Sequence, residues 1–414
     1  MPGYEVRTGT SARLSRIEGD LKAGRKVTIK AESGGKVVVT GEATFEGQVT
    51  IDCDFECGTM KVEGLGFGPG GNVTIRGNLT VHGRADFDAS ATVDGTISSE
   101  DLDVGGHLES GPIDSKRVRA GGHLTVKGGL KAETVDVGGH MKVLGGVSLQ
   151  DLRVGGHAEF EGGSILGEIR VRGHITSKKK LDFGQLEVFG SFSLPAGSSG
   201  QRLSALGTVR FEGDAACKEL EVSGAASVKG NLGAERVEVK GKLDVSGGLR
   251  VSDRLRVYGT LDVGRVVECE NLGVLGRLVG ESVRVGGSAD VAGEVRTTAG
   301  LKAKSVQVGR GSRVTGPIVG GEVEVGRETD FGSMWGLPWW RSAVGSMTTV
   351  GDVYGQSVRL CQRSSAKRVY GDMVELQDGA TAQQVTYTKG LKLPSKYSLH
   401  EPPVRTERLP EPPL

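Results

Sequence analysis

The sequence predicts an all-β protein, a long triangular parallel β-helix whose turns each take about 17 residues. Three observations predict it. Glycine recurs at a spacing of 17, apolar residues alternate with polar ones around each recurring glycine, and aromatic residues are scarce. Glycine accounts for 69 of the 414 residues and aromatic residues for only 5% of them. The core is therefore expected to be thin and aliphatic.

The recurring glycine marks a corner of each turn. A spacing of 17 separates Gly122, Gly139, Gly156, Gly173, Gly190, Gly207, Gly224 and Gly241, and Gly259 and Gly276 continue it at 18 and 17. Within one turn the apolar residues form the pairs Val135 and Val137, Met141 and Val143, Val147 and Leu149, Leu152 and Val154. A period of two indicates a strand with one buried face, and the glycines between pairs accept sharp corners. We expect three short strands per turn, stacked parallel on those of the next turn.

Five segments follow from where this period runs and where it fails. They are an N-terminal extension (1–13), the main β-helix (14–330), a tryptophan-rich interruption (331–350), further β-helix turns at a spacing of 16 (351–394) and a proline-rich tail (395–414). The tail contains five of the twelve prolines and no apolar period. We expect it to be disordered.

Charge and cysteine content restrict the classes of partner and compartment. Lys and Arg number 52 against 51 Asp and Glu, so no positive excess attracts nucleic acid or an anionic membrane. The five cysteines do not form the framework of a secreted disulfide protein. We find neither a signal peptide nor about 18 consecutive apolar residues. These features predict a cytoplasmic protein, at most peripherally associated with a membrane.

Five histidines occupy one repeat position. Each follows a corner glycine and precedes an inward apolar residue, so we expect an exposed ladder of His107, His123, His140, His157 and His174. One interpretation is a shared divalent metal ion. The other is that the repeat copies its corner residue, since later turns carry Ser191, Thr208, Ala225 and Lys242 there. We favour the second interpretation and predict no metal site.

No other motif predicts catalysis or a cofactor. Cys53 and Cys57 are four apart, unlike a zinc-ribbon pair, and the glycine-rich stretch 66–71 lacks the lysine and hydroxyl of a phosphate-binding loop. The turns are too short and uniform to wall a polysaccharide-cleaving groove with clustered carboxylates. We therefore predict no catalytic residues, no nucleotide and no cofactor.

The tryptophan-rich stretch has two interpretations. It contains Met334, Trp335, Leu337, Trp339 and Trp340. These side chains either cover an open part of the solenoid or form an exposed patch for a membrane or a partner. No basic cluster accompanies them, which favours covering.

The two ends of the repeat are predicted to assemble with further copies. A solenoid is open at both ends, where a whole turn of backbone lacks a partner, and monomeric solenoids usually cap those ends. We find no capping helix in the sequence. The predicted assembly residues are Ile17, Leu21, Val27 and Ile29 near one end and Val385, Tyr387, Leu391 and Leu393 near the other.

The stretch Ile17 to Ile29, the Gly-x-Leu-x-Val turns and the repeated Val-Tyr-Gly motif of Val353 to Leu360 and Val369 to Leu376 resemble bactofilins and related polymer-forming cytoskeletal proteins of bacteria and archaea. The resemblance implies a right-handed triangular β-helix, end-to-end filaments formed without nucleotide, frequent membrane association and disordered proline-bearing tails. This chain is several times longer than a bactofilin core and has the tryptophan interruption.

The sequence therefore predicts a structural protein that self-assembles end to end into a filament or scaffold, with itself as partner. Two alternatives remain open. One is a rod-like scaffold that does not polymerise, and the other is a β-helix enzyme or metal-binding protein.

Overall fold

The protein is built entirely from strands and turns. The structure, a computed structural model, describes residues 3–32, 35–63, 72–327, 347–395 and 398–413, and none of these residues is helical. All strand pairs with a described register are parallel, for example Val135 of one turn with Leu152 of the next. This confirms the predicted parallel β-solenoid. The chain divides into two compact units, one running to Gln201 and including Gly207–Val209, the other formed by Arg202–Leu206 and Arg210–Leu414.

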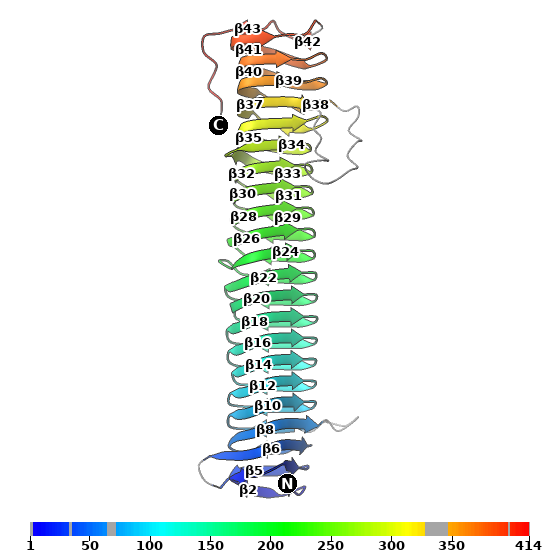
Figure 1. Ribbon diagram of the computed structural model, residues 1–414, viewed down its shortest axis with the longest axis vertical. Helices are drawn as coiled ribbons and strands as arrows, with labels where there is room; N and C mark the ends of the chain where they lie inside the picture. The colour runs from blue at the N-terminus through cyan, green and yellow to red at the C-terminus, as the bar shows by residue number, and fades with distance from the viewer. Residues whose placement is uncertain (1–2, 33–34, 64–71, 328–346, 396–397, 414) are drawn as a thin grey trace. The chain divides into compact units, whose positions relative to one another are not determined.

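The first unit contains the strands up to β23, and its long strands from β10 to β22 stack one on another (Figure 1). Their bounds are β1 Tyr4–Val6, β2 Ser11–Leu14, β3 Arg16–Ile17, β4 Leu21–Ala23, β5 Val27–Ala31, β6 Lys36–Glu46, β7 Val49–Ile51, β8 Asp54–Glu63, β9 Asn72–Ile75, β10 Leu79–Phe87, β11 Ser90–Val93, β12 Ile97–Val104, β13 His107–Ser110, β14 Ile113–Ala120, β15 His123–Val126, β16 Leu130–Val137, β17 His140–Val143, β18 Val147–Val154, β19 His157–Phe160, β20 Gly163–Val171, β21 His174–Ser177, β22 Leu181–Val188 and β23 Ser191–Leu194.

The second unit contains the strands from β26 onward, and β24 and β25 contribute residues to both units. The bounds are β24 Ser199–Ala205, β25 Thr208–Phe211, β26 Ala215–Val222, β27 Ala225–Val228, β28 Leu232–Val239, β29 Lys242–Val245, β30 Leu249–Val257, β31 Thr260–Val263, β32 Val266–Val274, β33 Arg277–Val285, β34 Ser288–Val291, β35 Glu294–Gly309, β36 Arg313–Thr315, β37 Ile318–Arg327, β38 Thr348–Val350, β39 Val353–Leu360, β40 Ser364–Leu376, β41 Thr381–Lys392, β42 Ser398–Leu399 and β43 Val404–Arg405.

A typical coil has one short strand and one long strand rather than three short ones. The short strand β17 has four residues and alternates exposed and buried side chains. The long strand β18 has eight residues, and its alternation slips by one residue at Gln150 and Asp151, between the pairs Val147/Leu149 and Leu152/Val154. One strand thus carries two of the predicted apolar pairs, and its pairing with β20 is irregular between Leu149 and Leu152, where the apolar pattern breaks.

Inward side chains stack in rows, and each coil contributes one residue to each row. Each row joins residues that pair in register, so a valine, leucine or methionine lies on its equivalents in the next coils. Val137 and Leu152 are fully buried, and Met141 is only 1% exposed. The fold is stabilised chiefly by removing these aliphatic rows from water.

The corner glycines are required by close backbone approach. A Cβ on Gly139 would lie 2.2 Å from the carbonyl oxygen of Gly122 in the preceding coil, whereas one on the adjacent Gly138 would meet nothing nearer than 3.9 Å. The amide of His140 donates to that same carbonyl, at 2.9 Å. In this corner pair, sterics therefore require glycine at position 139 but not at position 138.

The solenoid includes residues beyond the predicted repeat. β1 and β2 lie in the predicted extension 1–13, where β1 pairs with β4 and β2 with β5. In the predicted disordered tail, β42 and β43 both pair with β41. The shorter spacing of the predicted C-terminal turns is seen in the pairing of Val353 with Val369.

Candidate assembly surfaces and outward rows

The first coil leaves part of the core open. Within the described residues, β1, β2 and β3 each pair with later strands on one side only. Tyr4 occupies an inward row with Leu21 and Ala43, yet it is 46% exposed, whereas they are 1% and 0% exposed. Ala12 is likewise half-buried although its row partner Ile29 is fully buried. The end of the aliphatic core is therefore accessible at this coil.

Three of the four predicted N-terminal assembly residues lie in the second coil. Ile17 alone of the four lies in the first coil. Ile17 is in β3 of the first coil and is 8% exposed. Leu21, Val27 and Ile29 belong to the second coil, between the first and third, and are at most 2% exposed. These three residues are part of the core. The accessible positions predicted for them are occupied instead by Tyr4 and Ala12.

The last described coil is partly covered. β42 lies against Thr381 and Ala382, and β43 lies against Thr386 and Tyr387. Of the predicted C-terminal assembly residues, Val385 is fully buried, while Tyr387, Leu391 and Leu393 are half-buried. Leu391 pairs with Val374 of the preceding coil and is more exposed than that residue, which is 2% exposed. Accessible core at this coil is confined to the part of β41 that follows Tyr387.

The predicted tryptophan patch, Met334, Trp335, Leu337, Trp339 and Trp340, lies outside the described residues.

The five histidines form a ladder, which we call the histidine row. Neighbouring ring centroids from His107 to His174 are 6.1, 5.0, 5.8 and 5.1 Å apart. Two of the pairs, His123 with His140 and His157 with His174, are nearly parallel stacks. The row results from register, because in-register parallel strands place identical repeat positions side by side.

The chemistry of the histidine row is that of closely stacked rings. Burial, with further contributions from His174 and His140, lowers the pKa of His157. The Nδ1 atom of His174 lies 2.5 Å from the hydroxyl of Ser191 in the next coil. Among the described residues, no group of three or more His, Cys, Asp or Glu is arranged to hold a metal ion.

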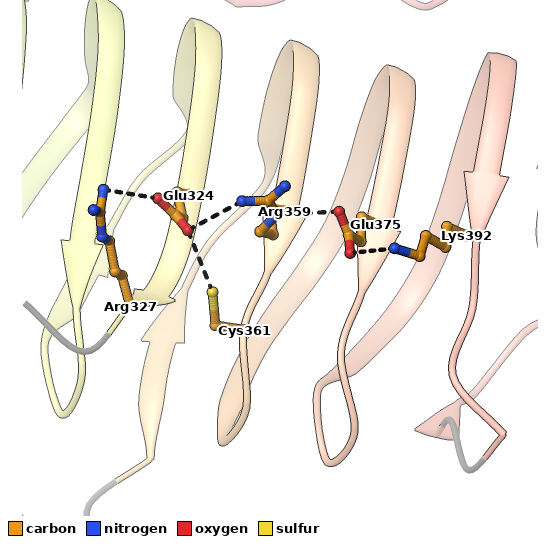
Figure 2. A network of polar contacts seen from close by, with 6 residues as sticks. All are labelled: Glu324, Arg327, Arg359, Cys361, Glu375 and Lys392. Atoms are coloured by element: carbon orange, nitrogen blue, oxygen red, sulfur yellow. Dashed lines mark hydrogen bonds and ion pairs between the residues drawn. The ribbon is translucent and has the colours of Figure 1, made fainter.

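A ladder of alternating charge crosses four coils of the second unit (Figure 2). Glu324 of β37 accepts from Arg327 at 3.2 Å and lies 3.6 Å from Arg359 of β39. Arg359 donates to Glu375 of β40 at 3.1 Å, and Lys392 of β41 donates to the same carboxylate at 3.0 Å. Lys392 holds the pKa of Glu375 below its usual value. The ladder fixes the register of outward positions by charge, as the aliphatic rows do inside.

Four of the five cysteines are buried and have the properties of structural core residues, whereas Cys53 is half-buried. Burial raises the pKa of Cys57, Cys217 and Cys269 to about 12 and that of Cys361 to about 11. The Cys361 thiol also donates to Glu324 at 3.7 Å, at the edge of the charge ladder (Figure 2). Thiols with such pKa values are weak nucleophiles at neutral pH.

A second outward row was not predicted from the sequence. Its members pair in register from coil to coil, and we call them the tyrosine row: Val319, Tyr354, Tyr370, Thr386 and Val404. The rings of Tyr354 and Tyr370 stack with centroids 4.7 Å apart. The signal in the sequence is the motif Val-Tyr-Gly, which occurs once in each of two successive turns.

Comparisons with protein-family models, with curated proteins and with solved structures find no match for this chain. No helix suited by length and hydropathy to crossing a membrane occurs among the described residues.

Proposed function

We propose that the protein is a structural β-solenoid without enzymatic activity, which self-assembles through its terminal coils into nucleotide-independent filaments or a scaffold. The exposed inward positions of the first coil carry the proposal. Tyr4 and Ala12 continue rows that are otherwise buried, and the strands that hold them have an unpaired edge within the described residues. A second copy seated there would bury apolar surface, worth about 25 cal/mol per Å², and would satisfy backbone groups.

The resemblance to bactofilins supports the same function. That family polymerises from parallel β-helices without nucleotide, and the Val-Tyr-Gly turns that carry the resemblance lie in regular coils of this chain. We further propose that the protein is cytoplasmic. We also propose that its tryptophan-rich segment makes a peripheral membrane contact.

Partial covering of the last coil favours a second candidate, a scaffold that does not polymerise. β42 and β43 occupy two stretches of the edge of β41, and Pro402 and Pro403 between them lack the amide that a further strand would need. In this case association would involve the first coil alone and would stop at a pair of molecules.

Sedimentation velocity at micromolar concentration, without nucleotide, tests the proposal. We expect large species for the wild type, and smaller ones for Tyr4→Asp, because a charge at the accessible end of the core opposes burial. Leu391→Asp distinguishes the candidates, since a filament needs that end and a pair does not. The matched control is Leu166→Asp, which alters a side chain that is 70% exposed on β20. A monomeric wild type, or a Tyr4→Asp variant that assembles like Leu166→Asp, would contradict the proposal.

A further inference from the structure

The chain's C-terminal segment, residues 406–413, lies over the tyrosine row. We call this segment the strap. It leaves β43 and runs back alongside the coils of the second unit toward the level of β37 (Figure 1). A cavity of about 1000 Å³ separates the two, lined on one side by Val319, Tyr354 and Tyr370 and on the other by Arg405 to Pro412. The tyrosine row is therefore the coil-side wall of a groove, and the strap lies across that groove.

The coil side of the groove has the chemistry of a proline-recognition surface. Such surfaces combine exposed aromatic side chains with a shallow channel, and they bind extended proline-rich segments at low entropic cost. Here two stacked tyrosine rings supply the aromatic wall. Polar groups beside them, Asp372 and Lys389, form an ion pair at 2.8 Å, so the wall is apolar with a charged margin.

The strap has the matching length and composition. Four steps between coils, from Val319 to Val404, span about 19 Å at about 4.8 Å per step. Eight residues in a polyproline conformation span about 25 Å at about 3.1 Å each. Residues 406–413 read Thr-Glu-Arg-Leu-Pro-Glu-Pro-Pro, and Leu409 is half-buried although its neighbours are exposed. The strap is thus long enough to span the row, and its half-buried Leu409 lines the same pocket as the two tyrosines.

Few polar contacts hold the strap. The amide of Thr406 donates to the carbonyl of Tyr387 at 2.9 Å, and Arg405 donates to the carbonyl of Thr388 at 3.3 Å. Beyond these, no hydrogen bond or ion pair joins residues 407–413 to the coils within the described structure, and Arg408 pairs instead with Glu411 of the strap itself, at 3.2 Å. The strap is anchored at its start and can be displaced along the rest of its length.

We propose that the tyrosine row is a docking groove for an extended proline-rich segment, and that the strap is its resident ligand within the same chain. A proline-rich segment of a partner with the same chemistry would enter the groove by displacing the strap. The groove lies on the side of the coils, so this inference is independent of whether the ends assemble.

Binding of a fluorescent synthetic peptide with the sequence of residues 406–413, measured by anisotropy on the full chain, tests the proposal. The double substitution Leu409→Asp with Pro410→Gly releases the strap. We expect the released variant to bind the peptide about tenfold more tightly than the wild type, whose own strap competes. Adding Tyr354→Ala and Tyr370→Ala to it should weaken binding at least about tenfold.

Two controls keep the test sharp. Phe189→Ala, in the released background, removes an exposed aromatic ring outside the groove and should leave binding unchanged. A peptide with glycine in place of its three prolines should bind weakly. Thermal unfolding should be the same for all variants, since both tyrosines face outward. A released variant that fails to bind the peptide, or that binds it equally well without the two tyrosines, would overturn the proposal.

Discussion

The coils that carry the histidine row and those that carry the tyrosine row have the same interior and different exteriors. Inside, both stack fully buried aliphatic residues, such as Val137 in the first and Val353 in the second. Outside, the histidine row is a ladder of rings without a covering segment in the described structure, whereas the tyrosine row faces the strap across a groove. The interior therefore specifies the solenoid, and the outward rows distinguish one region from another.

The largest effect on the free energy of unfolding is expected for glycine substitutions, because the two regions differ in which atoms an added Cβ would meet. Gly139→Ala in the histidine coils places a methyl group 2.2 Å from a backbone oxygen, which cannot move without shifting a coil. Gly355→Ala in the tyrosine coils meets the Cγ2 atom of Val358 at 2.9 Å, which a side chain can partly relieve. We expect Gly139→Ala to lower the free energy of unfolding by about 3 kcal/mol and Gly355→Ala to lower it by about 1 kcal/mol.

Denaturant unfolding measures both losses, with Gly138→Ala as the matched control because its Cβ has room. Equal stability of the Gly138 and Gly139 variants would contradict the steric explanation of the corner.

A smaller effect is expected from the charge ladder. The histidine coils carry an alternating row at the equivalent position, Asp103, Arg119, Asp136 and Arg153, in which Arg119 and Asp103 lie 4.0 Å apart. Glu324→Gln removes the carboxylate that pairs with Arg327 and one of the two carboxylates that pair with Arg359. These are partly exposed pairs, so the loss should be at most about 1 kcal/mol and should shrink at high salt. Thermal unfolding at low and high ionic strength would check it, with Glu322→Gln on the same strand as control. A loss that is independent of salt would indicate that packing, and not charge, is responsible.

The smallest effect at neutral pH is expected for the histidine row. His140→Ser with His157→Ser should leave stability unchanged there, since the next coil already carries Ser191 in register with His174. The variants should differ on acidification. The pKa of His157 is lowered in the folded state, so the unfolded chain binds more protons, and stability falls as pH drops from about 6.5 through the folded pKa.

Thermal unfolding between pH 8 and pH 5 would measure this difference. The wild type should lose more stability than the double variant, although carboxylates such as Glu159 lower both curves at more acidic pH. Identical profiles would mean that His157 is protonated as easily in the folded chain as in the unfolded one.

Sequence periodicity predicted the inward rows because each coil repeats the same apolar positions at a nearly constant spacing. It could not predict the first coil, where β1 and β2 are short and precede the regular glycine corners. β42 and β43 are shorter still, too short for any period, and the prolines around them are typical of disorder.

Outward rows are harder to read than inward ones. The histidine row was visible because its members recur in successive coils without interruption. The tyrosine row was missed because the interruption lies between Val319 and Tyr354, which pair in register although they are far more than one regular spacing apart in the sequence. Leu21, Val27 and Ile29 lie in the second coil and not in the first, because the pattern identifies core positions but not which coil is the terminal one.

Electron microscopy of the purified full chain, in buffer without nucleotide, tests the central claim most directly. We expect filaments or end-joined particles that persist at high salt, because apolar burial at the terminal coils is not screened as charge pairing is. We also expect their loss in Tyr4→Asp and their retention in Leu166→Asp. Single, unassociated particles of the wild type across micromolar concentrations and both salt conditions would contradict the claim.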